Sequence, residues 1–124
     1  MQGEKRLTQL ETVHKLVEIL DMKKAQNIIA LDLKGATIIA DYFVICTAGS
    51  APQMRALYEA ALEKMAELGI HADSCEGIKN TDWALVDFGG VVLHIFSTQM
   101  RDFYGLDNLW ADADKLDITT IDEV

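Results

Sequence analysis

The stretch WALVDFGGVVLHIF, residues 83–96, decides how this chain folds, because two apolar runs flank the pair Gly89-Gly90. Two glycines between such runs predict an antiparallel hairpin with a two-residue turn. With that turn Phe88 lies opposite Val91, and the register of every other pair follows. Side chains alternate between the two faces of a strand. The sequence therefore assigns each residue of the hairpin to one of two faces.

The two faces of the predicted hairpin differ in character. One face is wholly apolar and is expected to lie in the core: Ala84, Val86, Phe88, Val91, Leu93 and Ile95. The other face is mixed: Trp83, Leu85, Asp87, Val92, His94 and Phe96. Two interpretations of the mixed face stay open. It is either a sheet face under a helix, in which His94 and Asp87 bind each other diagonally, or a docking surface anchored by Trp83, since Trp is enriched at binding hot spots.

Two helices are predicted before the hairpin. Thr8-Gln9-Leu10-Glu11 has the form of a capping box, and an apolar stripe at helical spacing follows it. Residues 9–24 are therefore expected to form the first helix. Ser50 as N-cap and Gly69 just beyond the last turn predict a second helix over residues 51–68.

The remaining pattern places strands around the second helix. Residues 27–33 and 41–47 are rich in aliphatic, aromatic and β-branched side chains and predict strands, and 70–75 is a weaker candidate. Residues 98–110 predict a last helix. The long connection through the second helix suits a crossover between parallel strands. The expected fold class is α/β: a layered α-β-α domain with a mixed sheet of about five strands.

The length and charge of the chain limit its organisation and its partners. Its 124 residues fit one domain, expected over residues 1–110, followed by an acidic tail at 111–124. The formal net charge of −9 argues against free nucleic acid as a partner, because phosphate binding depends on Lys and Arg. A basic protein surface is the better match.

The cysteines and the N-terminus suggest a cytoplasmic protein. Cys46 and Cys75 form no CxxC pair and have no His at ligand spacing, so two buried, reduced thiols are expected and a zinc site is not. The first residues carry no apolar run typical of a signal peptide, and no stretch reaches membrane-spanning length. We therefore expect a bacterial, cytoplasmic protein that does not bind membranes.

Three segments together resemble one known family. The first is the strand at residues 41–47, and the second is Glu76-Gly77 followed by Asp82-Trp83 and the mixed face of the hairpin. The closing motif consists of Arg101, Tyr104, Leu106, Leu109 and Trp110. In this order and spacing they resemble the Iojap family of ribosomal silencing factors, over nearly the whole chain.

The resemblance implies a nucleotidyltransferase-like fold without known catalytic activity. It implies that the protein binds the large ribosomal subunit through ribosomal protein fourteen, at the face where the subunits meet. The bound factor would sterically block joining of the small subunit and so repress translation when nutrients are short. Such proteins are often homodimers in isolation, so a homodimer is also possible here.

A docking surface follows from the mixed face and this resemblance together. It is expected to include Glu76, Asp82, Trp83, Leu85 and Asp87, with Arg101 and Tyr104 flanking it from the last helix. Carboxylates beside a Trp anchor suit a basic ribosomal protein. Trp110 is expected to pack back on the domain and to stabilise it.

The alternatives are nucleotidyltransferase-like proteins, either inactive or catalytic. Gly49-Ser50 at a helix start resembles the phosphate-holding turn of nucleotidyltransferases. Their Mg²⁺ site also needs paired carboxylates, whereas residues 85–89 carry Asp87 alone. We therefore predict no enzyme, no catalytic residues, no metal and no cofactor, and Ser50 as a simple N-cap. An inactive nucleotidyltransferase-like adaptor is the alternative function, and a Mg²⁺-dependent nucleotidyltransferase is less favoured.

Overall fold

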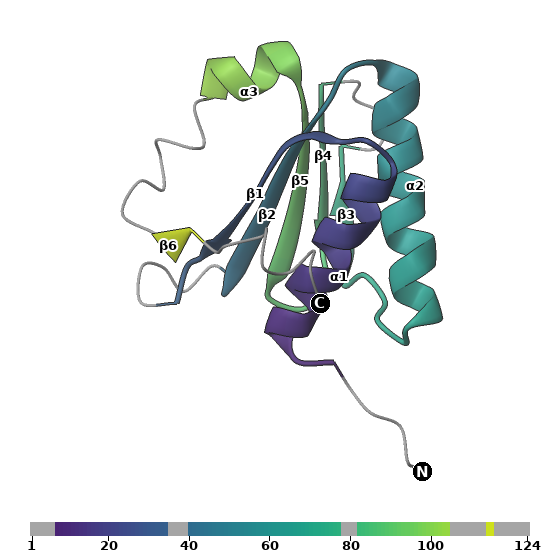
Figure 1. Ribbon diagram of the computed structural model, residues 1–124, viewed down its shortest axis with the longest axis vertical. Helices are drawn as coiled ribbons and strands as arrows, with labels where there is room; N and C mark the ends of the chain where they lie inside the picture. Colours follow the sequence, from purple (N-terminus) through teal and green to yellow (C-terminus); the bar gives the residue numbers. More distant parts are fainter. Residues whose placement is uncertain (1–6, 35–39, 78–81, 105–113, 116–124) are drawn as a thin grey trace.

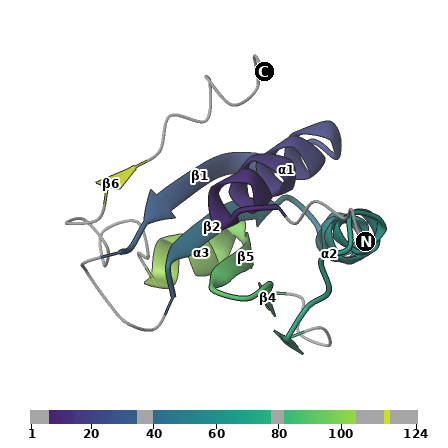
Figure 2. The ribbon, with the colours of Figure 1, turned by 90° about the horizontal axis from the view of Figure 1, so that it is seen from below.

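A mixed sheet of six strands, in the order β3-β4-β5-β2-β1-β6, organises the structure, which is a computed structural model (Figure 1). The structure describes residues 7–34, 40–77, 82–104 and 114–115. The helices are α1 (Gln9–Met22), α2 (Ala51–Glu67) and α3 (Thr98–Tyr104). The strands are β1 (Gln26–Asp32), β2 (Tyr42–Ala48), β3 (Ser74–Glu76), β4 (Trp83–Asp87), β5 (Val91–Ser97) and β6 (Asp114–Lys115). Figure 2 shows α1 and α2 on one side of the sheet and α3 on the other, which confirms the predicted α/β layers.

Both predicted helix starts are confirmed by their caps. Thr8 Oγ1 accepts from Glu11 N at 3.1 Å, and Glu11 Oε1 accepts from Thr8 N at 2.8 Å, so the capping box is complete. Ser50 Oγ accepts from Gln53 N at 3.2 Å at the start of α2. Gly69 lies beyond the end of α2 with φ +84°, a conformation that favours glycine. Local chemistry therefore positions both long helices.

The central strand β2 determines the topology. All seven of its residues are buried. It pairs in parallel with β5, and α2 lies in the connection between them, as the predicted crossover requires. On its other side β2 pairs antiparallel with β1. The sheet is therefore mixed, as expected.

The hairpin has the register that its Gly-Gly turn predicts. Phe88 N donates to Val91 O at 2.9 Å, and the paired residues run from Asp87 opposite Val92 to Trp83 opposite Phe96. Gly89 and Gly90 have φ values of +80° and +92°. Two successive positive φ angles are those of a hairpin turn whose twist matches its strands.

The sheet has an apolar cluster on each face. The larger cluster lies under α1 and α2 and includes all six residues of the apolar hairpin face. A smaller cluster forms on the other face of the sheet. Its members include Leu31 of β1, Leu33 just after β1, Phe43 and Ile45 of β2, and Val92 and Phe96 of β5. The mixed face of the hairpin is thus part of a second core and not a free surface throughout.

Four expectations need correction or lie outside the described residues. The weak strand predicted at 70–75 is shorter and lies later in the chain: it is β3, Ser74–Glu76. The sheet has six strands because β6, inside the segment predicted as a tail, pairs with β1. Cys46 is buried, which raises its pKa to about 12, but Cys75 is exposed and not buried as predicted. Trp110 lies outside the described residues.

No helix in the described part of the chain is long and apolar enough to cross a membrane.

Candidate docking site

The strand pairing extends the mixed hairpin face across the sheet. Residues directly opposite each other on paired strands project to the same side. We call this side, on which α3 lies, the second face. Three rows of residues cross it: Glu76, Leu85, His94 and Ile45; Trp83, Phe96 and Thr47; Asp87, Val92 and Phe43.

Exposure on the second face increases toward β3 and β4. Val92, His94 and Phe96 of β5 are buried, whereas Trp83, Leu85 and Asp87 of β4 are half-buried. Glu76 on the edge strand β3 is exposed. The accessible part of the predicted docking surface is therefore the β3–β4 edge of the sheet. The strand β5 lies beneath it as support.

A cluster of rings supports Trp83. Its ring lies nearly parallel to Phe96, with centroids 6.3 Å apart, and to His94, with centroids 6.4 Å apart. The His94 and Phe96 rings are parallel within 3° at 5.8 Å. Phe43 of β2 meets the His94 ring edge-on at 4.5 Å. Aromatic pairs in these geometries add stabilisation beyond the buried area, so the Trp83 ring is held in one orientation.

His94 is the polar centre of this cluster. Its Nδ1 accepts from Trp83 Nε1 at 3.4 Å, so the proton of the neutral imidazole is assigned to Nε2. Nε2 is buried and has no hydrogen-bond partner among the residues that the structure describes. Burial lowers the pKa of His94 to about 4, because the charged imidazolium loses its hydration there.

The predicted diagonal contact between His94 and Asp87 is wrong. Asp87 Oδ1 instead accepts from Gly89 N at 2.9 Å and from Gly90 N at 3.1 Å. A carboxylate satisfies the turn amides well because both bonds are local. Asp87 therefore stabilises the hairpin turn, and His94 has Trp83 as its polar partner.

Asp82 connects the site to the start of α3. Its carbonyl oxygen accepts from Ser97 N at 2.8 Å, and its Oδ1 accepts from Ser97 Oγ at 3.1 Å. Ser97 Oγ in turn accepts from Met100 N at 3.2 Å in the first turn of the helix. Asp82 and Trp83 are thus tied through β5 to α3.

Arg101 has an internal role that the sequence did not indicate. Its side chain is 9% exposed, and Nη1 donates to Asn27 O at 2.7 Å and to Thr47 Oγ1 at 2.9 Å. Asn27 lies at a β-bulge of β1 with φ +50°. These bonds join α3 to β2, which is two strands or roughly 10 Å from β4 and Trp83, and to β1, which is one strand further. Tyr104 is the last residue of α3, and its side chain lies outside the described part of the structure.

Gly77 lies beside the candidate site, and its structural role was not predicted from the sequence. Its φ is +78°, and a Cβ at this position would collide with the carbonyl oxygen of Trp83. Only glycine, which has no Cβ, allows the backbone after β3 to pass this close to the backbone of Trp83 at the start of β4. The sequence signal for this role was that Glu76-Gly77 and Asp82-Trp83 occur together in one family motif.

A nucleotidyltransferase would need a metal site and a phosphate-holding turn. Among residues 7–34, 40–77, 82–104 and 114–115, no three His, Cys, Asp or Glu residues are grouped so that they could hold a metal ion. Gly49 N donates to Gln53 Oε1 at 2.6 Å, and Ser50 caps α2, as the simpler interpretation predicted. The second face instead presents the half-buried Trp83 on the rings of His94 and Phe96, with the exposed Glu76 on the neighbouring strand.

Several known proteins similar to this chain are named as ribosomal silencing factors. Residues 6–124 match the model of the family described as ribosomal silencing factor during starvation. The ribosomal silencing factor of Bacillus subtilis is 40% identical over 98 residues, covering 79% of this chain and 83% of the relative. A mouse protein named mitochondrial assembly of ribosomal large subunit protein 1 is 30% identical over 98 residues, covering 77% of this chain and 43% of the relative. A crystal structure of a Chromobacterium violaceum protein superposes with a TM-score of 0.82 at 30% identity, covering 85% of this chain and 88% of that one.

Proposed function

Because this chain belongs to the Iojap family of ribosomal silencing factors, we propose that it binds the large ribosomal subunit through ribosomal protein fourteen and blocks joining of the small subunit. The block is steric, so it needs no catalytic step and no cofactor. The single observation that carries the proposal is the family match over residues 6–124. The mouse relative, whose name refers to assembly of the large ribosomal subunit, supports the same subunit as partner. The protein would act in the cytoplasm, where bacterial ribosomes are.

We assign the docking surface to the β3–β4 edge of the second face. Trp83 is half-buried, so it can lose its remaining hydration on binding, and its ring contacts with His94 and Phe96 already fix its orientation. A pre-oriented aromatic side chain loses little conformational entropy on binding. Leu85, also half-buried, extends the apolar centre of the site. Such an anchor is typical of interface hot spots.

Charge supplies the second part of the recognition. Glu76 is exposed on the strand next to β4, Asp82 is half-buried beside Trp83 in the sequence, and Asp87 is half-buried at the other end of β4, next to the hairpin turn. The whole chain carries a formal charge of −9. Rim charges act mainly on the association rate and on orientation, so a basic ribosomal protein would be attracted from a distance. Arg101 and Tyr104 are proposed to shape this site from α3. A homodimer in isolation is proposed as well.

The test is subunit joining followed in sucrose gradients. Purified small and large subunits are mixed with and without the protein, and the joined fraction is measured. We expect the joined fraction to fall and the protein to co-sediment with the large subunit. Unchanged joining at saturating protein would refute the proposal.

A matched pair of variants locates the surface. Glu76→Lys reverses an exposed charge on the second face, and Glu63→Lys reverses an exposed charge on α2, on the opposite side of the sheet. We expect Glu76→Lys to slow association with the large subunit by about tenfold at low salt and Glu63→Lys to change it little. Equal effects of the two variants would move the docking surface elsewhere.

A further inference from the structure

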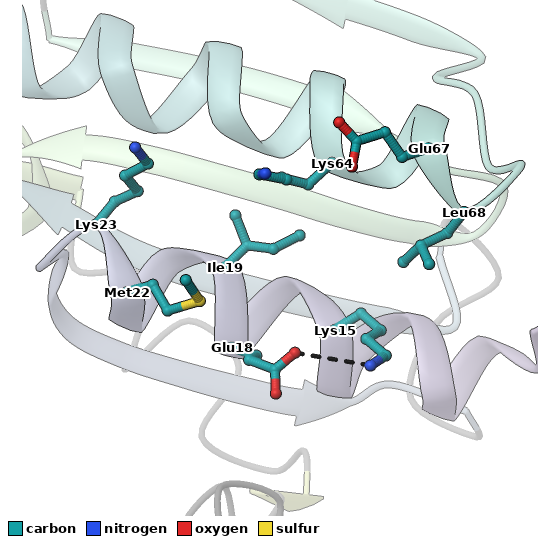
Figure 3. A pocket seen from close by; sticks show the side chains of 8 residues that line it. All are labelled: Lys15, Glu18, Ile19, Met22, Lys23, Lys64, Glu67 and Leu68. Carbon is teal, nitrogen blue, oxygen red and sulfur yellow. Dashed lines mark ion pairs between the residues drawn. The ribbon is translucent and has the colours of Figure 1, made fainter.

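A second surface lies on the other side of the sheet, between α1 and α2. There the two helices form a groove with a volume of about 250 Å³. Ile19 lies in its floor, and Met22 and Leu68 lie at its sides and ends (Figure 3). Met22 is 72% exposed and Leu68 is 42% exposed, two of the three large apolar side chains described as exposed. This groove is thus an apolar surface that the proposed ribosome contact leaves unused.

The charges around the groove oppose those of the whole protein. The chain has a formal charge of −9, yet the groove is lined by three lysines and two glutamates: Lys15, Lys23, Lys64, Glu18 and Glu67. Among the described residues, these five side chains form a single ion pair, in which Lys15 Nζ lies 3.7 Å from Glu18 Oε1. The ammonium groups of Lys23 and Lys64 have no partner in the described part of the chain. Beside the apolar floor, within the residues that the structure describes, the rim therefore carries two unpaired ammonium groups, of Lys23 and Lys64, against one unpaired carboxylate, that of Glu67.

The shape of the groove comes from two antiparallel helices. Gln53 Nε2 at the start of α2 donates to Lys24 O just beyond the end of α1 at 3.0 Å, which holds the opposite ends of the helices together. Two helices side by side leave a furrow into which the side-chain ridges of a third helix can pack. Amphipathic helices commonly bind in such grooves through apolar anchors one turn apart.

From this combination of shape, apolarity and charge, we propose that the α1–α2 groove binds an amphipathic helix of another protein whose apolar stripe is flanked by Asp or Glu. The apolar stripe would cover Ile19, Met22 and Leu68. The flanking carboxylates would bind the ammonium groups of Lys23 and Lys64. Because the groove lies on the side of the sheet opposite to the second face, this partner could bind while the ribosome contact is occupied.

Other occupants fit the groove less well. A nucleic acid would leave the apolar floor of Ile19, Met22 and Leu68 uncovered, because it binds mainly through its phosphates. A flat membrane surface would contact exposed Met22 but not Ile19, which is 7% exposed in the floor.

The experiment uses the full chain and two synthetic peptides. The first is a helical peptide of about 18 residues with leucines at helical spacing and glutamates on both flanks. The second has lysine in place of every glutamate. Binding is measured by fluorescence anisotropy, and the bound surface is mapped from amide NMR shifts of the labelled protein. We expect the acidic peptide to bind about tenfold more tightly than the basic one, with shifts confined to α1 and α2.

Two charge reversals on α2 provide the matched control. Lys64 lines the groove and Arg55 does not, and both are exposed. We expect Lys64→Glu to weaken acidic-peptide binding about tenfold and Arg55→Glu to change it less than about twofold. Thermal melts of both variants should stay close to wild type, because neither position is in the core.

Several results would overturn this proposal. Equal affinity for the two peptides, no measurable binding, or shifts centred on β4 and β5 would each do so. Equal effects of Lys64→Glu and Arg55→Glu would remove the groove as the site. Binding of anionic phosphatidylglycerol vesicles without peptide binding would assign the surface to membranes. A dimer in light scattering that Lys64→Glu dissociates would assign it to a second copy.

Discussion

Acidification should destabilise the protein through His94. The folded protein holds this imidazole neutral, with its pKa lowered to about 4 from the ordinary value of 6.5. The unfolded chain exposes it to water and protonates it at the ordinary value. Between these two pH values the unfolded state binds more protons than the folded state, so the free energy of unfolding falls as the pH falls. This loss of unfolding free energy is nearly absent at neutral pH and reaches its full size only below about pH 4.

The size of this effect follows from the two pKa values. Their full separation corresponds to roughly 3 kcal/mol. Integrated only from pH 7.5 to pH 5, the linkage gives about 2 kcal/mol. The group is 6% exposed, so little screening by solvent reduces this figure. The effect is a substantial fraction of the roughly 5–15 kcal/mol by which a small domain is stable.

The assay is urea unfolding at several pH values between 7.5 and 5 for wild type and His94→Asn. Asparagine does not titrate, and its Oδ1 can replace Nδ1 as acceptor for Trp83 Nε1. We expect wild type to lose about 2 kcal/mol more than His94→Asn over this range, whatever the absolute stability of the variant. His71→Asn, at an exposed position, is the control and should follow wild type. Equal pH dependence in wild type and His94→Asn would refute the reasoning.

Three further predictions concern the site and its support. Trp83→Ala should weaken large-subunit binding by about 2 kcal/mol or more in co-sedimentation while the melt shows a folded protein; intact binding would remove Trp83 from the surface. Gly77→Ala should lower the free energy of urea unfolding by about 2 kcal/mol or more, because it combines a positive φ with a collision against the Trp83 carbonyl; an unchanged midpoint would contradict this close approach. Arg101→Met should cost about 3 kcal/mol of stability, since it removes charged hydrogen bonds to Asn27 O and Thr47 Oγ1. Weaker ribosome binding at unchanged stability would instead place Arg101 at the partner.

Local features of the sequence determined a large part of the fold. The caps at Thr8 and Ser50 and the glycine at 69 locate α1 and α2 to within about two residues, because each acts within one helical turn. The Gly89-Gly90 turn determined the hairpin register, since a two-residue loop leaves one pairing. From that register alone the mixed face, with Trp83 on it, could be predicted.

The tertiary structure decided which parts of that face are open and what each polar side chain binds. The gradient from buried His94 to exposed Glu76 depends on β2, α3 and β3 packing around the hairpin, which no local pattern encodes. Arg101 binds a carbonyl 74 residues away in sequence, at a bulge that only the β1–β2 register creates. The α1–α2 groove likewise exists only once two distant helices lie side by side. Turn and cap chemistry acts over a few neighbouring residues, whereas burial and hydrogen-bond partners are set by segments that the chain brings together only on folding.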